Sequence, residues 1–542
     1  MLLSTGPPSL VSKLAQLLAL IGIIGLFLHT SRLYEHRQYS PVSTVDLRGT
    51  TSGISAEDQY LSRIAERCGL TNVTSWMTWR ISSTEQSYEW QSVTDVKHNF
   101  QSSSSSKIVD MTHPNNSDIR AKKRMNLPVP QSPRPGTVDA SDLLFGISTT
   151  FERVRENDFA MIKTWARWLT TGRHGSNGAS LVVMLDRALT QEVDMMDAEL
   201  AKYGIDAYVT TTEEPMSLAR RYYELARILK TFGVNLVANG QHKRWFALIE
   251  DNVFFPSLSY LLDRLYGYNS DEQLYVGLPS ERADWERLDR TITTYGGGAI
   301  FLTRSAIAEI PRLPCFSKQT ESGLPIRAKG WDMLLQDCIT KYTNLNMHVL
   351  PGFYSPKDEL YFSDIDSYES GLQPLLLHHP KGRHNLDVTQ AHLVTDVCGE
   401  SCFMQRYKFH DNWVLVNGVS ITEYPNGVQF EHPKDAEGAA LDDEEYGSQQ
   451  SPKQSSRIST PRRVVIEEEV ATDKPVMTWK GDKRVWTLVD SVAGKNGAVW
   501  QAYVKRANLA SKKDTERIDS VIVLIWEAPG MFTPKKRMSH PE

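Results

Sequence analysis

The stretch that decides the fold is Trp245-Phe246-Ala247-Leu248-Ile249-Glu250-Asp251-Asn252. Its five consecutive apolar residues are typical of a strand that is buried on both faces, as the strands of a parallel sheet are. The run ends abruptly in two carboxylates and a carboxamide. Because ligands of open α/β sheets bind outside the carboxyl ends of the strands, these oxygens lie where a cation and a diphosphate would bind. Asp and Asn are also common in plain turns, so the stretch alone leaves both alternatives open.

Strands and helices alternate before this stretch. Strands are predicted at Leu143–Ser148, Leu181–Asp186 and Ala207–Val209, and helices at Phe159–Leu169, Val193–Lys202 and Ser217–Phe232. The order strand, helix, strand, helix, strand requires crossover connections and therefore a largely parallel sheet. The predicted fold class is α/β, with a mostly parallel sheet flanked by helices.

Two features after the acidic stretch support a ligand site. The cluster Gly296-Gly297-Gly298 precedes the apolar run Ile300-Phe301-Leu302, and successive glycines remove Cβ atoms where a backbone must approach a ligand closely. The apolar run Leu375-Leu376-Leu377 ends in His378 and His379, and imidazole is a common metal ligand. Both features have a structural alternative, since glycine clusters also form plain turns and histidine pairs are more often structural.

A later helix carries two candidate catalytic carboxylates. This helix is predicted from Met333 to Tyr342, with Asp332 just before it and Asp337 further along. Asp332 can serve either as the N-cap of the helix or as a general base. The sequence pattern alone does not choose between these two roles.

The composition describes a water-soluble chain with one apolar exception. The 542 residues include 60 Lys and Arg against 65 Asp and Glu, a formal net charge of −5, which argues against a nucleic-acid binder. The apolar run Leu14–Leu28 reaches the roughly 20 residues of a spanning helix only with its flanks Leu10–Thr30. No small-residue cleavage site follows, which favours an uncleaved signal anchor over a cleaved signal peptide. The charges on either side leave its orientation open.

The regions on either side of the α/β segment differ from it in composition. Residues 31–140, with a serine run and a proline-rich run, predict a partly disordered stem that carries sequons at Asn72 and Asn115. Residues 411–542 predict a β-rich extension with a hairpin at Asn417-Gly418 and a disordered acidic insert at 431–475. The tryptophans of this extension, Trp479, Trp486, Trp500 and Trp526, are expected in its core rather than stacked on sugars.

The motifs from Leu143 to about Tyr407, in this order, resemble the fringe-like β-1,3-glycosyltransferases, specifically a fungal branch of predicted type II membrane proteins. The resemblance rests on the order of the motifs rather than on any single one. It implies a GT-A-like domain at residues 141–410 in the secretory lumen. Residues 1–12 would then be a cytosolic tail, and residues 13–30 a transmembrane anchor in the Golgi or ER membrane.

The resemblance also assigns roles to individual residues. The donor-binding residues are Thr149, Thr150, Arg153, Asp186, which contacts the uridine, Glu250, and the glycines Gly296, Gly297 and Gly298. The ligands of Mn²⁺ or Mg²⁺ are Asp251, Asn252 and His378, with His379 as the alternative to His378. The catalytic base is Asp332, with Asp337 as the alternative.

The implied activity is the transfer of a sugar from a UDP-sugar to a hydroxyl of a glycan or glycoprotein, with inversion and with help from a metal ion. Asn252 departs from the family, which has its principal aspartate ligand at that position. An asparagine removes one negative charge, so the affinity for the metal is expected to fall and Asp251 becomes the principal ligand. The alternative is a GT-A-fold protein that binds nucleotide-sugar or glycan without turnover. A purely structural protein would leave the ordered motif series unexplained.

The five cysteines fit the same resemblance. Cys315 precedes the helix that carries Cys338, and Cys398 lies close to Cys402. The simplest scheme in an oxidising compartment is two disulfides, with Cys68 left free.

Overall fold

The computed structural model describes residues 56–87, 93–101, 106–113, 116–121, 123–172, 175–278, 298–316, 330–350, 374–378, 386–431, 464–466, 476–494, 497–511 and 516–527. The predicted anchor at 13–30 lies outside these ranges, as do Gly296, Gly297 and His379. In the described ranges, no helix combines the length and the apolar character that a membrane span requires.

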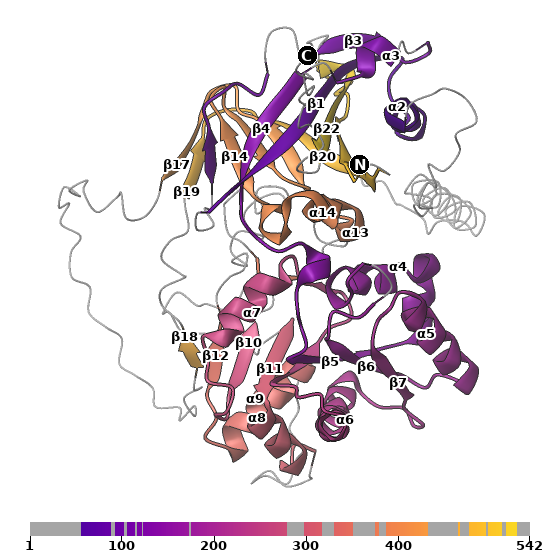
Figure 1. Cartoon of the computed structure of the whole chain (residues 1–542), viewed down its shortest axis with the longest axis vertical. Coiled ribbons are helices and arrows are strands. Elements are labelled where there is room, and N and C mark those ends of the chain that lie inside the picture. Colours follow the sequence, from indigo (N-terminus) through magenta and orange to yellow (C-terminus); the bar gives the residue numbers. More distant parts are fainter. Residues whose placement is uncertain are drawn as a thin grey trace, which may run out of the picture. The chain divides into compact units, whose positions relative to one another are not determined.

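The acidic stretch follows a strand of an eight-stranded sheet, most of whose strands are labelled in Figure 1. Its strands are β5 (Leu143–Thr149), β6 (Ser180–Leu185), β7 (Ala207–Thr211), β8 (Trp245–Ile249), β10 (Tyr275–Leu278), β11 (Ala299–Thr303), β12 (Met347–Val349) and β18 (Val464–Ile466). The spatial order is β18-β12-β10-β11-β8-β5-β6-β7. Strands β5 to β8 are parallel to one another, whereas β11 is antiparallel to both β8 and β10. The predicted α/β class is confirmed, and the sheet is mixed.

Helices cover both faces of this sheet. One face packs against α6 (Leu218–Ala238), α8 (Arg304–Glu309) and α9 (Trp331–Tyr342), and the other against α4 (Phe151–Leu169), α5 (Thr190–Lys202) and α7 (Leu258–Tyr266). In β8, Phe246 and Leu248 face the first group of helices, and Trp245, Ala247 and Ile249 face the second. Because both faces are buried, the strand is uniformly apolar rather than alternating.

The order of the strands reverses at β5. The chain runs outward from β5 through β6 to β7 and then returns to place β8 on the other side of β5. The crevice outside the carboxyl ends of two strands at such a switch point is the usual ligand site of an open α/β sheet. These two strands end at Thr149 and Ile249, and the acidic stretch follows Ile249 directly.

A second sheet, of ten strands, combines early and late segments of the chain. Its strands are β1 (Val73–Gln86), β2 (Thr94–Val96), β3 (Lys107–Asp110), β4 (Lys123–Pro130), β14 (Arg406–Phe409), β15 (Trp413–Val416), β16 (Ser420–Glu423), β20 (Arg484–Ala493), β21 (Val499–Lys505) and β22 (Asp519–Glu527). The predicted hairpin is confirmed, because β15 and β16 pair antiparallel with Val416 opposite Ser420. Trp486, Trp500 and Trp526 are at most 5% exposed, so they belong to the core as predicted, whereas Trp479 is half-buried.

The described parts of residues 73–130 belong to the second sheet and do not form the predicted stem. Strand β1 pairs in parallel with β22, from Thr74 opposite Asp519 to Ser82 opposite Glu527. Helix α2 (Ala56–Arg67) is fixed to the same sheet by an ion pair of 2.9 Å between Arg63 and Asp490 of β20. The β-rich unit is therefore built from both ends of the described chain and is not a small C-terminal extension. Of the predicted insert at 431–475, residues 464–466 form β18, and residues 432–463 and 467–475 lie outside the described ranges.

Shorter elements complete the described structure. The helical ones are α3 (Asn116–Ile119), η1 (Pro135–Thr137), η2 (Ile310–Arg312), α13 (Val388–Ala391), η3 (His392–Val394), α14 (Thr395–Cys398) and η4 (Glu400–Cys402). Two short pairs of strands are β9 (Val253–Phe254) with β13 (Leu377–His378) and β17 (Val428–Glu431) with β19 (Val476–Trp479). The predicted disulfides Cys315–Cys338 and Cys398–Cys402 are both present, and Cys68 is free.

The loop between Cys398 and Cys402 fastens α14 to the segment before β5 and to α7. The Glu400 amide donates to Pro133 O at 2.9 Å, and the Glu400 carboxylate accepts from Ser259 N at 2.8 Å and Ser259 Oγ at 2.7 Å. Burial raises the pKa of Glu400, and the hydrogen bonds from Ser259 and Ser257 oppose this rise. The disulfide thus closes a small loop whose polar groups are used in tertiary contacts.

Replacing Gly399 with alanine is expected to lower the free energy of unfolding. Gly399 has φ +84° and ψ 165°, and a Cβ there would lie 2.6 Å from Ser132 O. The backbone conformation costs a side chain about 1–3 kcal/mol, and the overlap adds about 1–3 kcal/mol. Gly427 is the matched control, since it has φ +96° but open space around the Cβ position. Urea unfolding of both variants measures the difference, and equal losses would contradict the close approach to Ser132.

Candidate functional site

Four parallel strands bring polar residues to the switch point. Thr149 ends β5, Asp186 follows β6, Thr212 follows β7, and Glu250 follows β8. The Asp186 amide donates to Thr149 O at 2.9 Å, which holds the ends of β5 and β6 side by side. The structure therefore brings the sequence-predicted residues of β5, β6 and β8 to one edge of the sheet.

Asp251 links the two strands at the switch point. One carboxylate oxygen accepts from Thr149 Oγ1 at 2.6 Å, and the other accepts from Arg153 Nη2 at 2.8 Å. Its backbone oxygen accepts from the Trp165 indole at 2.9 Å. Burial raises the pKa of Asp251, and the hydrogen bond from Thr149 and the charge of Arg153 oppose this rise. Both oxygens of the predicted principal metal ligand are thus engaged by side chains of β5 and α4.

Glu250 lies between a histidine and a tryptophan. Its Oε2 is 2.8 Å from His378 Nε2, and its Oε1 accepts from the Trp331 indole at 3.1 Å. His378 reaches this place because β13 pairs antiparallel with β9, with His378 opposite Val253. The structure therefore places His378 beside Glu250 of the acidic stretch.

Asp186 lies in a basic environment. Its Oδ2 is 2.7 Å from Arg221 Nη1, and its Oδ1 accepts from Thr212 Oγ1 at 3.3 Å. The next residue, Arg187, has φ +54°, and its amide donates to Thr212 Oγ1 at 3.0 Å. A non-glycine residue at positive φ is strained, and such strain clusters at functional sites.

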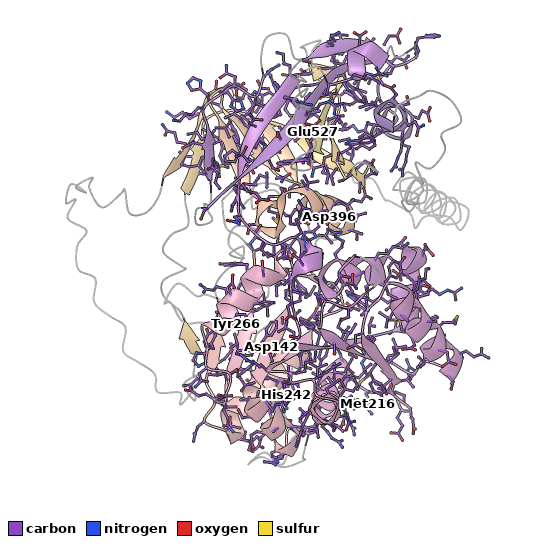
Figure 2. The ribbon with its side chains drawn as sticks, in the orientation of Figure 1. Asp142, Met216, His242, Tyr266, Asp396 and Glu527 are labelled. Carbon is purple, nitrogen blue, oxygen red and sulfur yellow. A yellow bond between two sulfur atoms is a disulfide. The ribbon has the colours of Figure 1, made fainter. Side chains whose placement is uncertain are left out.

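Helix α4 begins at the site and is interrupted after its first turn. Thr150 caps it, because its side chain accepts from Arg153 N at 3.3 Å. Residues 157–159 then have φ between 51° and 55°, a left-handed turn inside the helix. The second part of α4 has its own contacts, for example an ion pair of 2.9 Å between Arg167 and Asp396 of α14. Figure 2 labels Asp396. The first turn, with Thr150 and Arg153, is thus a short segment of its own beside Asp251.

The remaining predicted residues lie around this centre. Gly298 O accepts from Glu250 N at 3.3 Å, and a Cβ at Gly298 would lie 3.2 Å from a Leu376 methyl group. Asn252 is half-buried in the turn between β8 and β9. Asp332 is 2% exposed and Asp337 is half-buried. Burial chiefly raises the pKa of Tyr275 on β10, and the charges of both aspartates add to this rise. Trp331, the first residue of α9, contacts Glu250 through its indole.

Among the described residues, the side chains of the predicted metal site are arranged in pairs. Across the described ranges, no three His, Cys, Asp or Glu side chains gather closely enough to hold a metal ion. Glu250 and His378 meet as a pair, but the Asp251 carboxylate is occupied by Thr149 and Arg153. Divalent cations such as Mg²⁺ need several oxygen ligands, so this arrangement does not fit the ion without breaking the Asp251–Arg153 pair.

The structure adds site residues that the sequence did not single out. The Trp331 indole contacts Glu250 and stacks on Tyr222 with ring centroids 4.1 Å apart, and the Tyr222 hydroxyl donates to Ile249 O at 2.7 Å. Arg221 pairs with Asp186. Trp331 stood beside a candidate catalytic residue in the sequence, but no local pattern in the sequence predicts the stacked pair or the position of Arg221.

Comparison with known proteins gives a partial structural likeness. No protein-family model and no curated protein matches the chain. The apo form of the glycosyltransferase GlyE of Streptococcus pneumoniae TIGR4 is similar at 8% identity and a TM-score of 0.28, over 46% of this chain and 55% of that one. A glycosyltransferase involved in glycosylation of the major capsid of PBCV-1 is similar at 13% identity and a TM-score of 0.25, over 45% of this chain and 97% of that one. The chain thus matches about half the length of GlyE, and at these scores no functional conclusion rests on the likeness.

Replacing Trp331 with phenylalanine is expected to lower kcat/KM about 10-fold. The variant keeps a ring for stacking on Tyr222 but removes the hydrogen bond to the Glu250 carboxylate. A hydrogen bond to a charged group is worth about 1.5–3 kcal/mol. Tyr222→Phe is the control, because it removes a hydrogen bond of the same stacked pair that goes to the backbone and not to Glu250. A larger loss of kcat/KM in Tyr222→Phe than in Trp331→Phe would show that the stacked pair of Trp331 and Tyr222 acts through folding and not through Glu250.

Proposed function

We propose that this protein is a glycosyltransferase that transfers a sugar from a UDP-sugar to a hydroxyl of a glycan or glycoprotein. The observation that carries the proposal is the bridge across the switch point. Asp251, which follows β8, contacts Thr149 of β5 and Arg153 of α4, and Glu250 lies beside His378. This is the edge where an open α/β sheet usually binds its ligand. The described residues that the resemblance to the glycosyltransferase family assigns to the donor and the metal lie at this edge.

The proposed reaction is a direct displacement with inversion. The acceptor oxygen bonds to the anomeric carbon as the bond from that carbon to the UDP oxygen breaks, and a carboxylate takes the acceptor proton. Asp332 is the proposed base, with Asp337 as the alternative. Thr149, Thr150 and Asp186 are the proposed donor-binding residues. Inversion is measured by the anomeric configuration of the product.

The requirement for Mn²⁺ or Mg²⁺ stays a prediction of the resemblance. When bound, such an ion supplies positive charge to the departing diphosphate. Turnover measured in EDTA and after addition of each cation tests the requirement, and a rate that EDTA leaves unchanged would contradict it.

We also propose that the α/β unit works in the lumen of the Golgi or ER, behind an N-terminal signal anchor. Two disulfides among five cysteines support this location, because disulfides persist in oxidising compartments. Asn72 of the first sequon is exposed beside β1, which leaves it accessible to glycosylation. Loss of mass on treatment with an N-glycosidase tests the location, and a chain without glycans would count against it.

The direct test is a screen of UDP-sugars against glycan acceptors with the full-length protein. Release of UDP together with an acceptor product that has gained the mass of one sugar supports the proposal. The rival function is a binding module, favoured by Asn252 in place of an aspartate. Stabilisation of the protein by UDP without any product across the panel would support this rival, and restoration of turnover by Asn252→Asp would show that the missing carboxylate is the cause.

A further inference from the structure

Positive charge beside Asp251 comes from Arg153, an arginine that is already paired. Arg153 Nη2 donates to Asp251 Oδ1 at 2.8 Å, while Thr149 donates to the other oxygen of the same carboxylate. Asn252 brings no charge to the site. The acidic stretch therefore presents fewer anionic oxygens to a cation than its sequence suggests. The Arg153 guanidinium contacts one Asp251 carboxylate oxygen that a metal ion would otherwise bind.

Arg153 is placed to contact a ligand as well as Asp251. It lies one turn from the start of α4, and its side chain is 46% exposed, whereas that of Asp251 is only 10% exposed. Only Nη2 of the guanidinium is used by Asp251. A guanidinium has five N–H donors in a planar fork, and this fork matches the geometry of phosphate oxygens. Among the described residues, Asp251 is the side chain that pairs with Arg153, so the other donors of the guanidinium stay available to a ligand.

The left-handed turn at residues 157–159 separates this first turn from the rest of α4. The rest of α4 packs through Trp165, whose indole donates to Asp251 O at 2.9 Å. Asp251 therefore contacts both parts of α4, with its side chain on the first turn and its backbone on the second. This double contact makes Asp251 a positioning residue for Arg153.

We propose that Arg153, rather than a divalent cation, binds the donor diphosphate and stabilises UDP as it leaves. This inference rests on the proposed function and deepens it. In the displacement, the bond between the anomeric carbon and the oxygen of the β-phosphate breaks, and its electron pair stays on that oxygen. The Arg153 guanidinium donates hydrogen bonds to the phosphate oxygens that gain charge, and the acceptor proton goes to the carboxylate base. No redox partner or further co-reactant is needed.

The test is the affinity of the full-length protein for UDP, measured by calorimetry in EDTA and again with Mn²⁺. The wild-type protein is expected to bind UDP equally in both conditions. Arg153→Ala should weaken binding about 10- to 100-fold in EDTA, and Arg153→Lys, which keeps the charge but loses the fork, should lie between. Arg155→Ala is the matched control, because Arg155 is exposed on the same turn, and it should bind as the wild type does.

The outcomes separate this inference from the proposed function. Binding that appears only with Mn²⁺, or an Arg153→Ala variant that binds UDP normally, overturns the inference even if sugar transfer is found. Absence of UDP binding in both conditions also overturns it. Binding in EDTA that depends on Arg153, with no sugar transfer from any donor, supports the inference and counts against the proposed turnover. The unfolding midpoint of each variant shows whether a loss of binding reflects a loss of folding.

Discussion

Turnover is expected to fall about 10²–10⁴-fold when Asp332 is replaced by asparagine, the range that general bases contribute. The helix that carries Asp332 begins at Trp331, whose indole contacts Glu250 at 3.1 Å, so the first turn of α9 lies beside the acidic stretch. Asparagine has nearly the same shape as aspartate but cannot take the acceptor proton. The affinity for UDP should therefore stay within about threefold while kcat falls.

Asp337→Asn is the matched comparison for this prediction. Asp337 lies on the same helix and also raises the pKa of Tyr275, but it is half-buried, whereas Asp332 is 2% exposed. Single-turnover rates at saturating donor distinguish the two carboxylates. A loss confined to Asp337→Asn would assign the base to Asp337. Full activity in both variants would remove the base from α9 altogether and leave Glu250 as the carboxylate nearest to His378.

The α/β sheet was predictable because its strands are buried on both faces. β8 was predicted at Trp245–Ile249, which are its observed bounds, and β5 and β6 were each predicted to within one residue. A run of apolar residues that ends in turn residues marks such a strand without any knowledge of its neighbours. The strand order and the switch point were not predicted, because these buried strands are all similar apolar runs and nothing in them identifies the neighbouring strand.

Strand β1 was missed for the opposite reason. Its buried residues Trp76, Trp79 and Ile81 are separated by Ser, Thr and Arg. Such alternation is typical of a half-buried strand, but Val73–Gln86 was assigned to the stem because of the serine-rich and proline-rich runs that follow it. Its partner β22 lies at the far end of the chain, where Asp519 accepts a hydrogen bond from Thr71, 448 positions away. The alternation of apolar and polar residues could have indicated the strand, but no local pattern identifies a partner strand that is so distant in the sequence.

The sequence indicated which residues lie at the candidate site, but not which of their side chains contact one another. The sequence identified Thr149, Asp251, Glu250 and His378, and the structure brings all four to one edge. It could not show that Asp251 pairs with Arg153, because that contact depends on where α4 begins relative to β8. The metal site was predicted from the residue types at the end of β8 and from the family resemblance, and neither reveals that the Arg153 guanidinium pairs with the Asp251 carboxylate.

Asp251→Ala is expected to lower kcat/KM about 100-fold. The variant removes the group that holds both Thr149 and Arg153 across the switch point, at 2.6 Å and 2.8 Å. Misplacement of a positioning group by about 1 Å can cost this much rate. The free energy of unfolding should fall by about 1–3 kcal/mol, because the buried Thr149 hydroxyl loses its acceptor. Arg153 adds little to this loss, since it is 46% exposed and water can solvate it. Steady-state kinetics in EDTA, with the urea midpoint as a check on folding, measure both effects.

A double-mutant cycle shows how Asp251 acts. If Asp251 serves catalysis by positioning Arg153, then Arg153→Ala already removes what Asp251 contributes, and the double variant should lose about as much kcat/KM as either single variant. If Asp251 instead held a metal ion, the fold-losses in kcat/KM of the two single variants would multiply in the double variant, so that their free energies add. Of the two single variants, only Asp251→Ala would then need more Mn²⁺ for its half-maximal rate. Residues in direct contact typically show coupling of about 0.5–3 kcal/mol, a range that this cycle resolves. Additive losses together with a raised requirement for Mn²⁺ would thus contradict the role assigned to Arg153 and return Asp251 to the metal.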